Sequence, residues 1–245
     1  MNCCRTLVTA HAGCLGTVPN SLANVDAALA SRADIVEVDM RTTRDGVVIL
    51  AHDEGTVLPD GRRARFSELE WDLVRKLPSP DSTGYLRLDD LLDRVRGLDR
   101  VLNLDAKEIG AMVIASRLLS GRGMATDAIF SGLDLAGIGA ASSGLPGFRY
   151  LFNADALISE GGGQTEIAEV CGLASAWGAC GINLEWTKAS ASLVDFARRR
   201  SLPVHLWTVD EPGDMVSVLR FGPFSITTNR PDMLTGLVRD GFQGE

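Results

Sequence analysis

The sequence lacks several features that would define its class at once. Its 245 residues carry a formal net charge of −8, so it has no excess of positive charge that would bind nucleic acid or an anionic membrane. No run of 18 apolar residues occurs, which excludes a membrane-spanning helix. The opening stretch "MNCCRTLVTAHAG" holds no apolar segment of signal-peptide length. We therefore expect a cytoplasmic protein without a nucleic-acid partner.

Cysteine is present, but not in a pattern that indicates a metal site or a disulfide framework. The five cysteines are an odd number and include no CxxC pair, which predicts free thiols. They are Cys3, Cys4, Cys14, Cys171 and Cys180. A glycine-rich GxGxxG turn is also missing, which disfavours a dinucleotide-binding sheet.

What the sequence does contain is an alternation of short apolar runs with longer amphipathic segments, the pattern of parallel βα units. Nine runs are predicted as strands, at 6–11, 34–40, 47–53, 101–107, 128–133, 148–154, 181–186, 203–209 and 224–228. The second and third are separated only by "RTTRDG", in which Asp45-Gly46 indicates a hairpin turn.

Helices are predicted between these runs, at 21–31, 67–77, 87–97, 109–121, 164–178, 190–200, 212–221 and 231–239. The glycines of "DLAGIGAASSGLPG" predict that the helix after the fifth run is short or irregular. Eight βα units and one hairpin partner favour a (β/α)8 TIM barrel over a doubly wound sheet. We expect one domain that spans residues 1–245, with the hairpin partner after the second strand.

Polar residues gather where the predicted strands end, which is where a barrel places its catalytic groups. Glu37 and Asp39 share one strand face, because residues i and i+2 point the same way. Asp105 on the next parallel strand adds a third carboxylate, and Lys107 follows it. Three carboxylates suit Mg²⁺ or Ca²⁺, which prefer oxygen ligands, and Lys107 suits an anionic substrate.

Two of the three histidines end an apolar strand at this same edge. We interpret His11 and His52 as catalytic, and His205, which lies inside a strand, as structural or barrel-lining. Later strands supply Glu185, Trp207 and Asn229 as candidate substrate-binding residues. A single polar residue in a strand is usually an ordinary surface or core residue, so the prediction depends on the whole group.

These motifs resemble the glycerophosphodiester phosphodiesterase family, whose members are metal-dependent TIM-barrel enzymes. The resemblance runs through "AHAG", "VEVDMRTTRDGVVILAHD", "LNLDAK", "VHLWTVDEPGDM" and "ITTNRPDML". It implies that His11 and His52 are the acid–base pair, that Lys107 binds phosphate, and that Glu37, Asp39 and Asp105 hold the metal. It also implies a small phosphodiester substrate and a place in lipid metabolism.

The sequence departs from the family at three positions. Ala12 replaces a phosphate-binding arginine, Pro19-Asn20-Ser21 replaces Pro-Glu-Asn-Thr, and Asp105 replaces the more common glutamate. These changes resemble the sphingomyelinase D-like lyases, which also end in a motif similar to "TTNRPD". Arg62, Arg63 and Arg65 are interpreted as a solvated turn outside the site.

Several alternatives stay open at the level of sequence. The enzyme is a hydrolase, or a lyase that forms a cyclic phosphate; it acts on a glycerophosphodiester, or on a specialised biosynthetic substrate. A catalytically silent ligand-binding barrel is the third reading. The sequence does not decide between Mg²⁺ and Ca²⁺. It also leaves open the leaving alcohol, transient contact with a lipid substrate and the oligomeric state.

Overall fold

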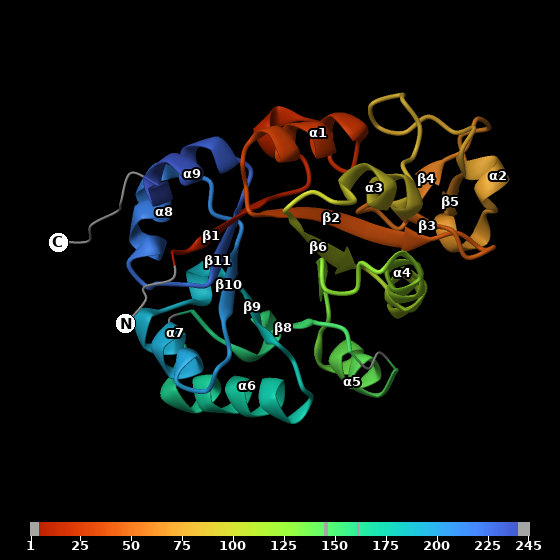
Figure 1. The fold of residues 1–245 in the computed structure, drawn as a ribbon. Coiled ribbons are helices and arrows are strands. Elements are labelled where there is room, and N and C mark those ends of the chain that lie inside the picture. The colour runs from red at the N-terminus through yellow and green to blue at the C-terminus, as the bar shows by residue number, and fades with distance from the viewer. Residues whose placement is uncertain (1–4, 145–146, 161, 240–245) are drawn as a thin grey trace.

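A computed structural model describes residues 5–144, 147–160 and 162–239. Eight parallel strands form the central sheet of this part of the chain (Figure 1). They are β1 (Leu7–Ala10), β2 (Ile35–Thr42), β6 (Val101–Ala106), β7 (Ala128–Ser131), β8 (Leu151–Asn153), β9 (Gly181–Glu185), β10 (Val204–Trp207) and β11 (Ser225–Thr228). A parallel bridge between Phe130 and Tyr150 links the two ends of the sheet, so the strands form a nearly closed barrel.

Helices surround this sheet and alternate with its strands, as Figure 1 shows. They are α1 (Leu22–Ala30), α3 (Leu88–Val95), α4 (Ile109–Arg122), α5 (Leu135–Gly144), α6 (Gln164–Ala176), α7 (Ala191–Arg198), α8 (Pro212–Leu219) and α9 (Pro231–Arg239). In α3 the buried residues recur at helical spacing: Leu88, Leu91, Leu92 and Val95. The TIM barrel predicted from the sequence is therefore confirmed.

The hairpin partner is also confirmed. β3 (Val48–Leu50) pairs antiparallel with β2, and Gly46 lies in the turn at a φ of 80°, a conformation that favours glycine. Ala51 N–H then donates to the Asp39 carbonyl at 3.1 Å. This bond brings the residue that follows, His52, to the barrel edge where the carboxylates lie.

Two local predictions were wrong. The predicted helix at 67–77 contains only a 3-10 turn (Phe66–Glu68) and the four-residue α2 (Trp71–Val74). Leu69 between them is extended, because its carbonyl accepts the N–H of Arg44 at 2.8 Å. The segment predicted to be short or irregular instead forms the ten-residue α5, where the Asp134 carboxylate accepts the N–H of Gly137.

A small unit beside β3 was not predicted. β4 (Gly55–Val57) and β5 (Arg63–Arg65) form a separate two-stranded sheet, which lies with α2 at one side of the barrel (Figure 1). Its own apolar cluster contains Ile49, Phe66, Val74 and Leu77. The unit thus extends the wall beyond β3 on the side of His52.

Cys14, Cys171 and Cys180 are free thiols, as predicted, whereas Cys3 and Cys4 lie outside the described residues. Among the residues that the structure describes, no helix combines the length and apolar character needed to cross a bilayer.

His205 lies inside the barrel, where it is 5% exposed and its Nδ1 is 2.8 Å from Ser225 Oγ. Burial, with a smaller effect from the Arg149 charge, lowers the pKa of His205 to about 3. The unfolded chain therefore binds a proton below the ordinary pKa of about 6.5, whereas the folded chain does not. The stability that this difference contributes is complete above pH 6.5 and is lost as the pH falls towards 3.

We therefore expect the stability difference between wild type and His205→Gln to shrink by about 2 kcal/mol between pH 7 and pH 5. Urea denaturation at both pH values measures it, and a comparison of pH 8 with pH 7 is the control in which the difference stays constant. A difference that does not change between pH 7 and pH 5 would contradict a neutral, buried His205.

Candidate active site

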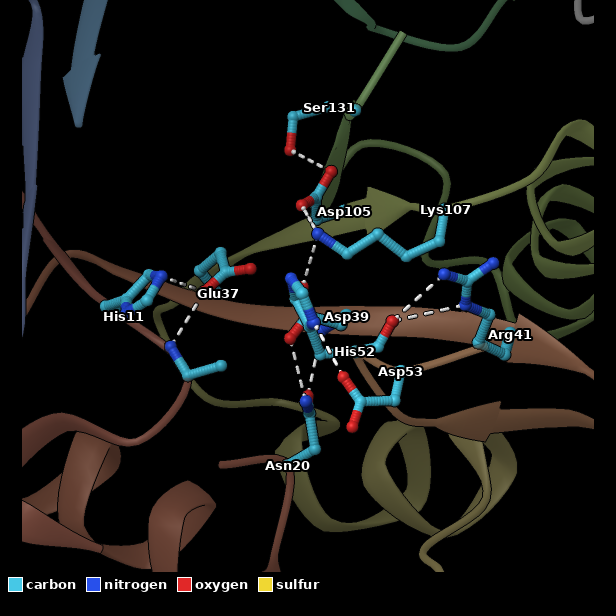
Figure 2. Close-up of polar contacts among 12 residues, drawn as sticks. His11, Asn20, Glu37, Asp39, Arg41, His52, Asp53, Asp105, Lys107 and Ser131 are labelled. Atoms are coloured by element: carbon cyan, nitrogen blue, oxygen red, sulfur yellow. Dashed lines mark hydrogen bonds and ion pairs between the residues drawn. The ribbon is translucent and has the colours of Figure 1, made fainter. Parts of the chain in front are cut away.

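Three carboxylates converge at the carboxyl ends of β2 and β6. Glu37 and Asp39 share the inner face of β2, and Asp39 is directly opposite Asp105 in the register of β6. One ligand oxygen of each lies within 4.8 Å of the others. Figure 2 shows the three side chains at the ends of their strands. Burial, together with the charges of Asp39 and Asp105, raises the pKa of Glu37 well above its usual value. The three side chains therefore repel one another when no cation is present.

Lys107 offsets part of this charge. Its Nζ lies 2.8 Å from Asp39 Oδ1 and also contacts Asp105 Oδ2, so the ammonium bridges the two aspartates (Figure 2). Burial alone would lower the pKa of Lys107, but the carboxylates of Asp105 and Asp39 raise it above its usual value. Lys107 is thus a permanent cation, as its predicted role in binding an anion requires.

Neutral donors bind one oxygen of Glu37 and one oxygen of Asp39. The backbone N–H of Ala12 donates to Glu37 Oε2 at 2.7 Å. Asn20 makes two bonds to Asp39: its Nδ2 donates to Oδ2 at 2.7 Å, and its Oδ1 accepts the Asp39 N–H at 2.9 Å. The loop after β1 therefore holds both β2 carboxylates in place.

The donor set fits a hard divalent cation. Three carboxylates and one ammonium leave two uncompensated negative charges when Glu37 is ionised, and one oxygen of each carboxylate lies within the reach of a single ion. The predicted ligands Glu37, Asp39 and Asp105 are therefore brought together.

His11 follows β1 and faces this cluster. Its Nε2 lies 4.0 Å from Glu37 Oε2, and its Nδ1 lies 2.9 Å from Asn229 Oδ1. Asn229 is oriented in turn by Asp210, whose Oδ2 accepts Asn229 Nδ2 at 2.8 Å and whose Oδ1 accepts the Asn229 N–H at 2.7 Å. Since an amide oxygen only accepts, this series of hydrogen bonds places a proton on Nδ1 of His11. The other ring nitrogen, Nε2, then faces the cluster.

His52 follows β3 and approaches the cluster from another side (Figure 2). Its side chain is 67% exposed, and its Nδ1 lies 3.2 Å from Asp53 Oδ1. Arg41 holds the backbone here, because its Nε and Nη2 donate to the His52 carbonyl at 3.2 and 3.0 Å. Both histidines thus have a side-chain oxygen beside Nδ1.

These residues share one cavity of about 820 Å³. Seven of the nine residues predicted for the site line it: His11, Glu37, Asp39, His52, Asp105, Lys107 and Trp207. The other two, Glu185 and Asn229, are not among its described lining residues. Asn229 contacts His11 instead, whereas the backbone N–H of Glu185 donates to Asp155 Oδ1 at 2.6 Å.

Three residues of the site were not assigned a role from the sequence: Asn20, Arg41 and Asp210. Asn20 was noted only as a departure from a motif, and Asp210 lies in the quoted "TVDEP" without a predicted partner. Arg41 follows Glu37 and Asp39 at the same i+2 spacing, a signal that could have placed it on the cavity wall.

The arginines of the β4–β5 unit do not line the cavity in the described part of the chain. Arg62 pairs with Asp60, and Arg65 pairs with Glu54 at 2.9 Å. Where the family has an arginine, Ala12 contributes only its backbone N–H. The positive side chains of the cavity wall are therefore Lys107 and Arg41, as far as the described residues go.

Comparison with solved structures supports the fold. A glycerophosphodiester phosphodiesterase from Parabacteroides distasonis is similar with a TM-score of 0.80 and 16% identity, over 96% of this chain and 98% of that one. One from Agrobacterium tumefaciens has a TM-score of 0.76 and 20% identity, over 94% and 99%. A phosphodiesterase from Oleispira antarctica, in complex with the product sn-glycerol-3-phosphate, has a TM-score of 0.79 and 15% identity, over 97% of this chain and 98% of that one.

No curated protein matches the sequence at a significant level. The sequence profile of the glycerophosphoryl diester phosphodiesterase family, in contrast, matches residues 11–125 and 163–233, which is more than half of the chain. The matched ranges include all three carboxylates, Lys107 and both cavity histidines. The chain belongs to the glycerophosphoryl diester phosphodiesterase family.

Proposed function

We propose that this protein is a metal-dependent phosphodiesterase that cleaves a glycerophosphodiester, and that His11 and His52 share the proton transfers. The observation that carries the proposal is the arrangement of one cavity: an acidic cluster bridged by Lys107, with a histidine approaching from β1 and another from β3. The relative from Oleispira antarctica, in complex with its product sn-glycerol-3-phosphate, supports this class of substrate.

Glu37, Asp39 and Asp105 would hold one divalent cation, Mg²⁺ or Ca²⁺. When bound, such an ion supplies positive charge to the phosphoryl oxygens, on which negative charge accumulates in the transition state. Lys107 supplies a second charge from the same wall of the cavity. Asn20 and the Ala12 N–H orient the carboxylates through the bonds to Asp39 and Glu37.

His11 is suited to exchange a proton at Nε2. Asn229 Oδ1 accepts the proton on Nδ1, so the neutral ring presents the Nε2 lone pair to the cavity and the protonated ring presents an N–H there. Asp210 is a positioning residue, because it fixes the Asn229 amide with its oxygen towards the ring. A direct contact between Asn229 and substrate, like one from Glu185, stays a prediction.

His52 is suited to the proton exchange at the open side of the cavity. Asp53 Oδ1 lies beside Nδ1, which leaves Nε2 for a water molecule, a substrate hydroxyl or the leaving oxygen. Because the His52 side chain is highly exposed, an alcohol that takes up a proton from it can leave directly to solvent. One histidine removes a proton from the attacking hydroxyl and the other protonates the leaving oxygen, and either water or the substrate supplies that hydroxyl.

Phosphorus NMR tests the function directly, with glycerophosphocholine and a lysophospholipid as substrates, with and without added Mg²⁺. Direct appearance of a monoester supports a hydrolase, and a cyclic phosphate signal supports a lyase of the same class. If metal binds but neither substrate is converted, the result favours a specialised substrate or a binding role and contradicts this proposal.

Removal of either cavity histidine should abolish most of the turnover. We expect His11→Ala and His52→Ala each to lower kcat/KM by roughly 100-fold or more, which is the usual contribution of a positioned acid or base. Arg62→Ala is the matched control, because this arginine pairs with Asp60 outside the cavity. Thermal unfolding should show an intact fold for His52→Ala, and wild-type turnover in either histidine variant would remove that residue from the mechanism.

Turnover should require a metal ion at the acidic cluster. We expect a chelator to abolish turnover, and added Mg²⁺ or Ca²⁺ to restore it. By calorimetry, Asp105→Asn should weaken binding of the cation by about tenfold or more, since it removes a negative ligand without changing its size. Full turnover in the presence of excess chelator would exclude a metal-dependent mechanism.

A further inference from the structure

A second cavity, of about 460 Å³, lies at the end of the barrel where β1, β2, β6 and β7 begin. The strands are parallel, so this end is opposite the acidic cluster. Asp34, which lines the cavity, precedes Asp39 by five residues, which is about 17 Å of extended strand. The two cavities share no described lining residue, and we name this one the basal cavity.

Arginines from four separate segments line the basal cavity. Three of them precede β1, β2 and β6, and the fourth ends α9. They are Arg5, Arg32, Arg100 and Arg239. The chain as a whole carries a formal net charge of −8, so this end of the barrel has a local excess of guanidinium groups on a negatively charged protein.

Only one of the four arginines forms an ion pair within the described part of the chain. Arg5 Nη1 donates to Asp34 Oδ2 at 2.9 Å, and Arg5 Nη2 contacts Asp34 Oδ1. Arg100 Nη1 donates at 2.6 Å to the backbone carbonyl of Asp99, which carries no net charge. The side chains of Arg32 and Arg239 have no hydrogen bond or ion pair to a described residue. Three guanidinium groups of the basal cavity therefore lack a negative partner.

Arg100 has the greatest need of such a partner. It is half-buried at the start of β6, and its Nε is buried without a hydrogen bond to any described residue. A charged group that is partly withdrawn from water is normally paired with an opposite charge. An anion in the basal cavity would compensate the guanidinium through its accessible edge, without having to reach Nε.

The carboxylates of the same cavity limit the charge of the ligand. Asp99 and Asp127 line it, and neither forms an ion pair in the described ranges; Asp127 Oδ1 accepts Thr126 Oγ1 at 3.3 Å. With Asp34 compensated by Arg5, three guanidinium groups and two carboxylates remain, which is an excess of one positive charge. This excess suits a small anion rather than a polyanion such as a nucleic acid.

We infer that the basal cavity binds a small phosphate-bearing anion, held by Arg32, Arg100 and Arg239. The planar donors of guanidinium match phosphate oxygens in pairs, which an ammonium does not. Leu98, which is 49% exposed, lines the same cavity and offers an apolar contact to an organic phosphate. The inference does not depend on the proposed function, because the basal cavity contains none of the residues assigned to that function.

Calorimetry with three probes tests the inference. The probes are inorganic phosphate, pyrophosphate and adenosine 5′-monophosphate, and a chelator in the buffer prevents divalent cations from bridging them to carboxylates. We expect pyrophosphate to bind with a Kd below about 1 mM. Tighter binding of the nucleotide than of inorganic phosphate identifies an organic phosphate as the ligand, and equal binding identifies the free anion.

Variants of opposite charge assign the binding to the basal cavity. Arg32→Gln and Arg239→Gln should each weaken pyrophosphate binding by roughly fivefold or more, because each removes a charged donor. Asp99→Asn should instead strengthen it by about threefold, since a repelling carboxylate is lost. A general loss of folding cannot produce this opposite sign.

Arg63→Gln is the matched control. Arg63 is an exposed arginine of β5 that has no partner among the described residues, and it lines neither cavity. Its loss should change the affinity for pyrophosphate by less than about twofold.

Two outcomes would overturn the inference and leave the proposed function unaffected. One is that neither inorganic phosphate nor pyrophosphate binds at millimolar concentration. The other is that Arg32→Gln and Arg239→Gln bind pyrophosphate as the wild type does. If binding is then lost in Lys107→Ala, the probe occupies the candidate active site rather than the basal cavity.

Discussion

The repulsion among three carboxylates is the constraint on which the rest of the site depends. Glu37, Asp39 and Asp105 come within 4.8 Å of one another in a largely buried place, where like charges interact strongly. The chain compensates them only in part, with one ammonium from Lys107, the Ala12 N–H and the Asn20 amide. Burial, together with the charges of Asp39 and Asp105, raises the pKa of Glu37 well above its usual value. The site is therefore built to gain stability when a cation enters.

The barrel produces this convergence through the register of two strands. The i, i+2 spacing places Glu37 and Asp39 on one face, and pairing of Asp39 with Asp105 brings in the third carboxylate. A shift of one residue in this register would turn one strand's carboxylates towards the covering helices. The apolar residues between them, such as Val38 and Leu104, are fully buried on that outer face and so fix the register. The same strand register therefore sets both the packing of the core and the positions of the site carboxylates.

The features that the sequence predicts correctly are those whose interacting residues lie close together along the chain. The positions of the barrel strands, the β2–β3 hairpin and the carboxylate faces depend on neighbours a few residues apart, and these were predicted, whereas the β4–β5 unit was not. The orientation of His11 was not, because Asn229 lies 218 residues away and depends on Asp210 in a third segment. The helix expected at 67–77 failed for the same reason: the bond from Arg44 to Leu69, between distant segments, overrides local helix propensity.

Ala12 changes the balance of positive charge more than it changes the geometry. Its N–H still orients Glu37, so the backbone role of this position is kept while an arginine side chain is absent. The cations that do line the described cavity are already engaged: Arg41 on the His52 carbonyl and Lys107 on two aspartates. A cation held by the acidic cluster would compensate Asp39 and Asp105 and so would release Lys107 to contact a phosphate. Under the proposed function, recognition of the anion would then depend on occupation of the acidic cluster, because position 12 carries no arginine side chain.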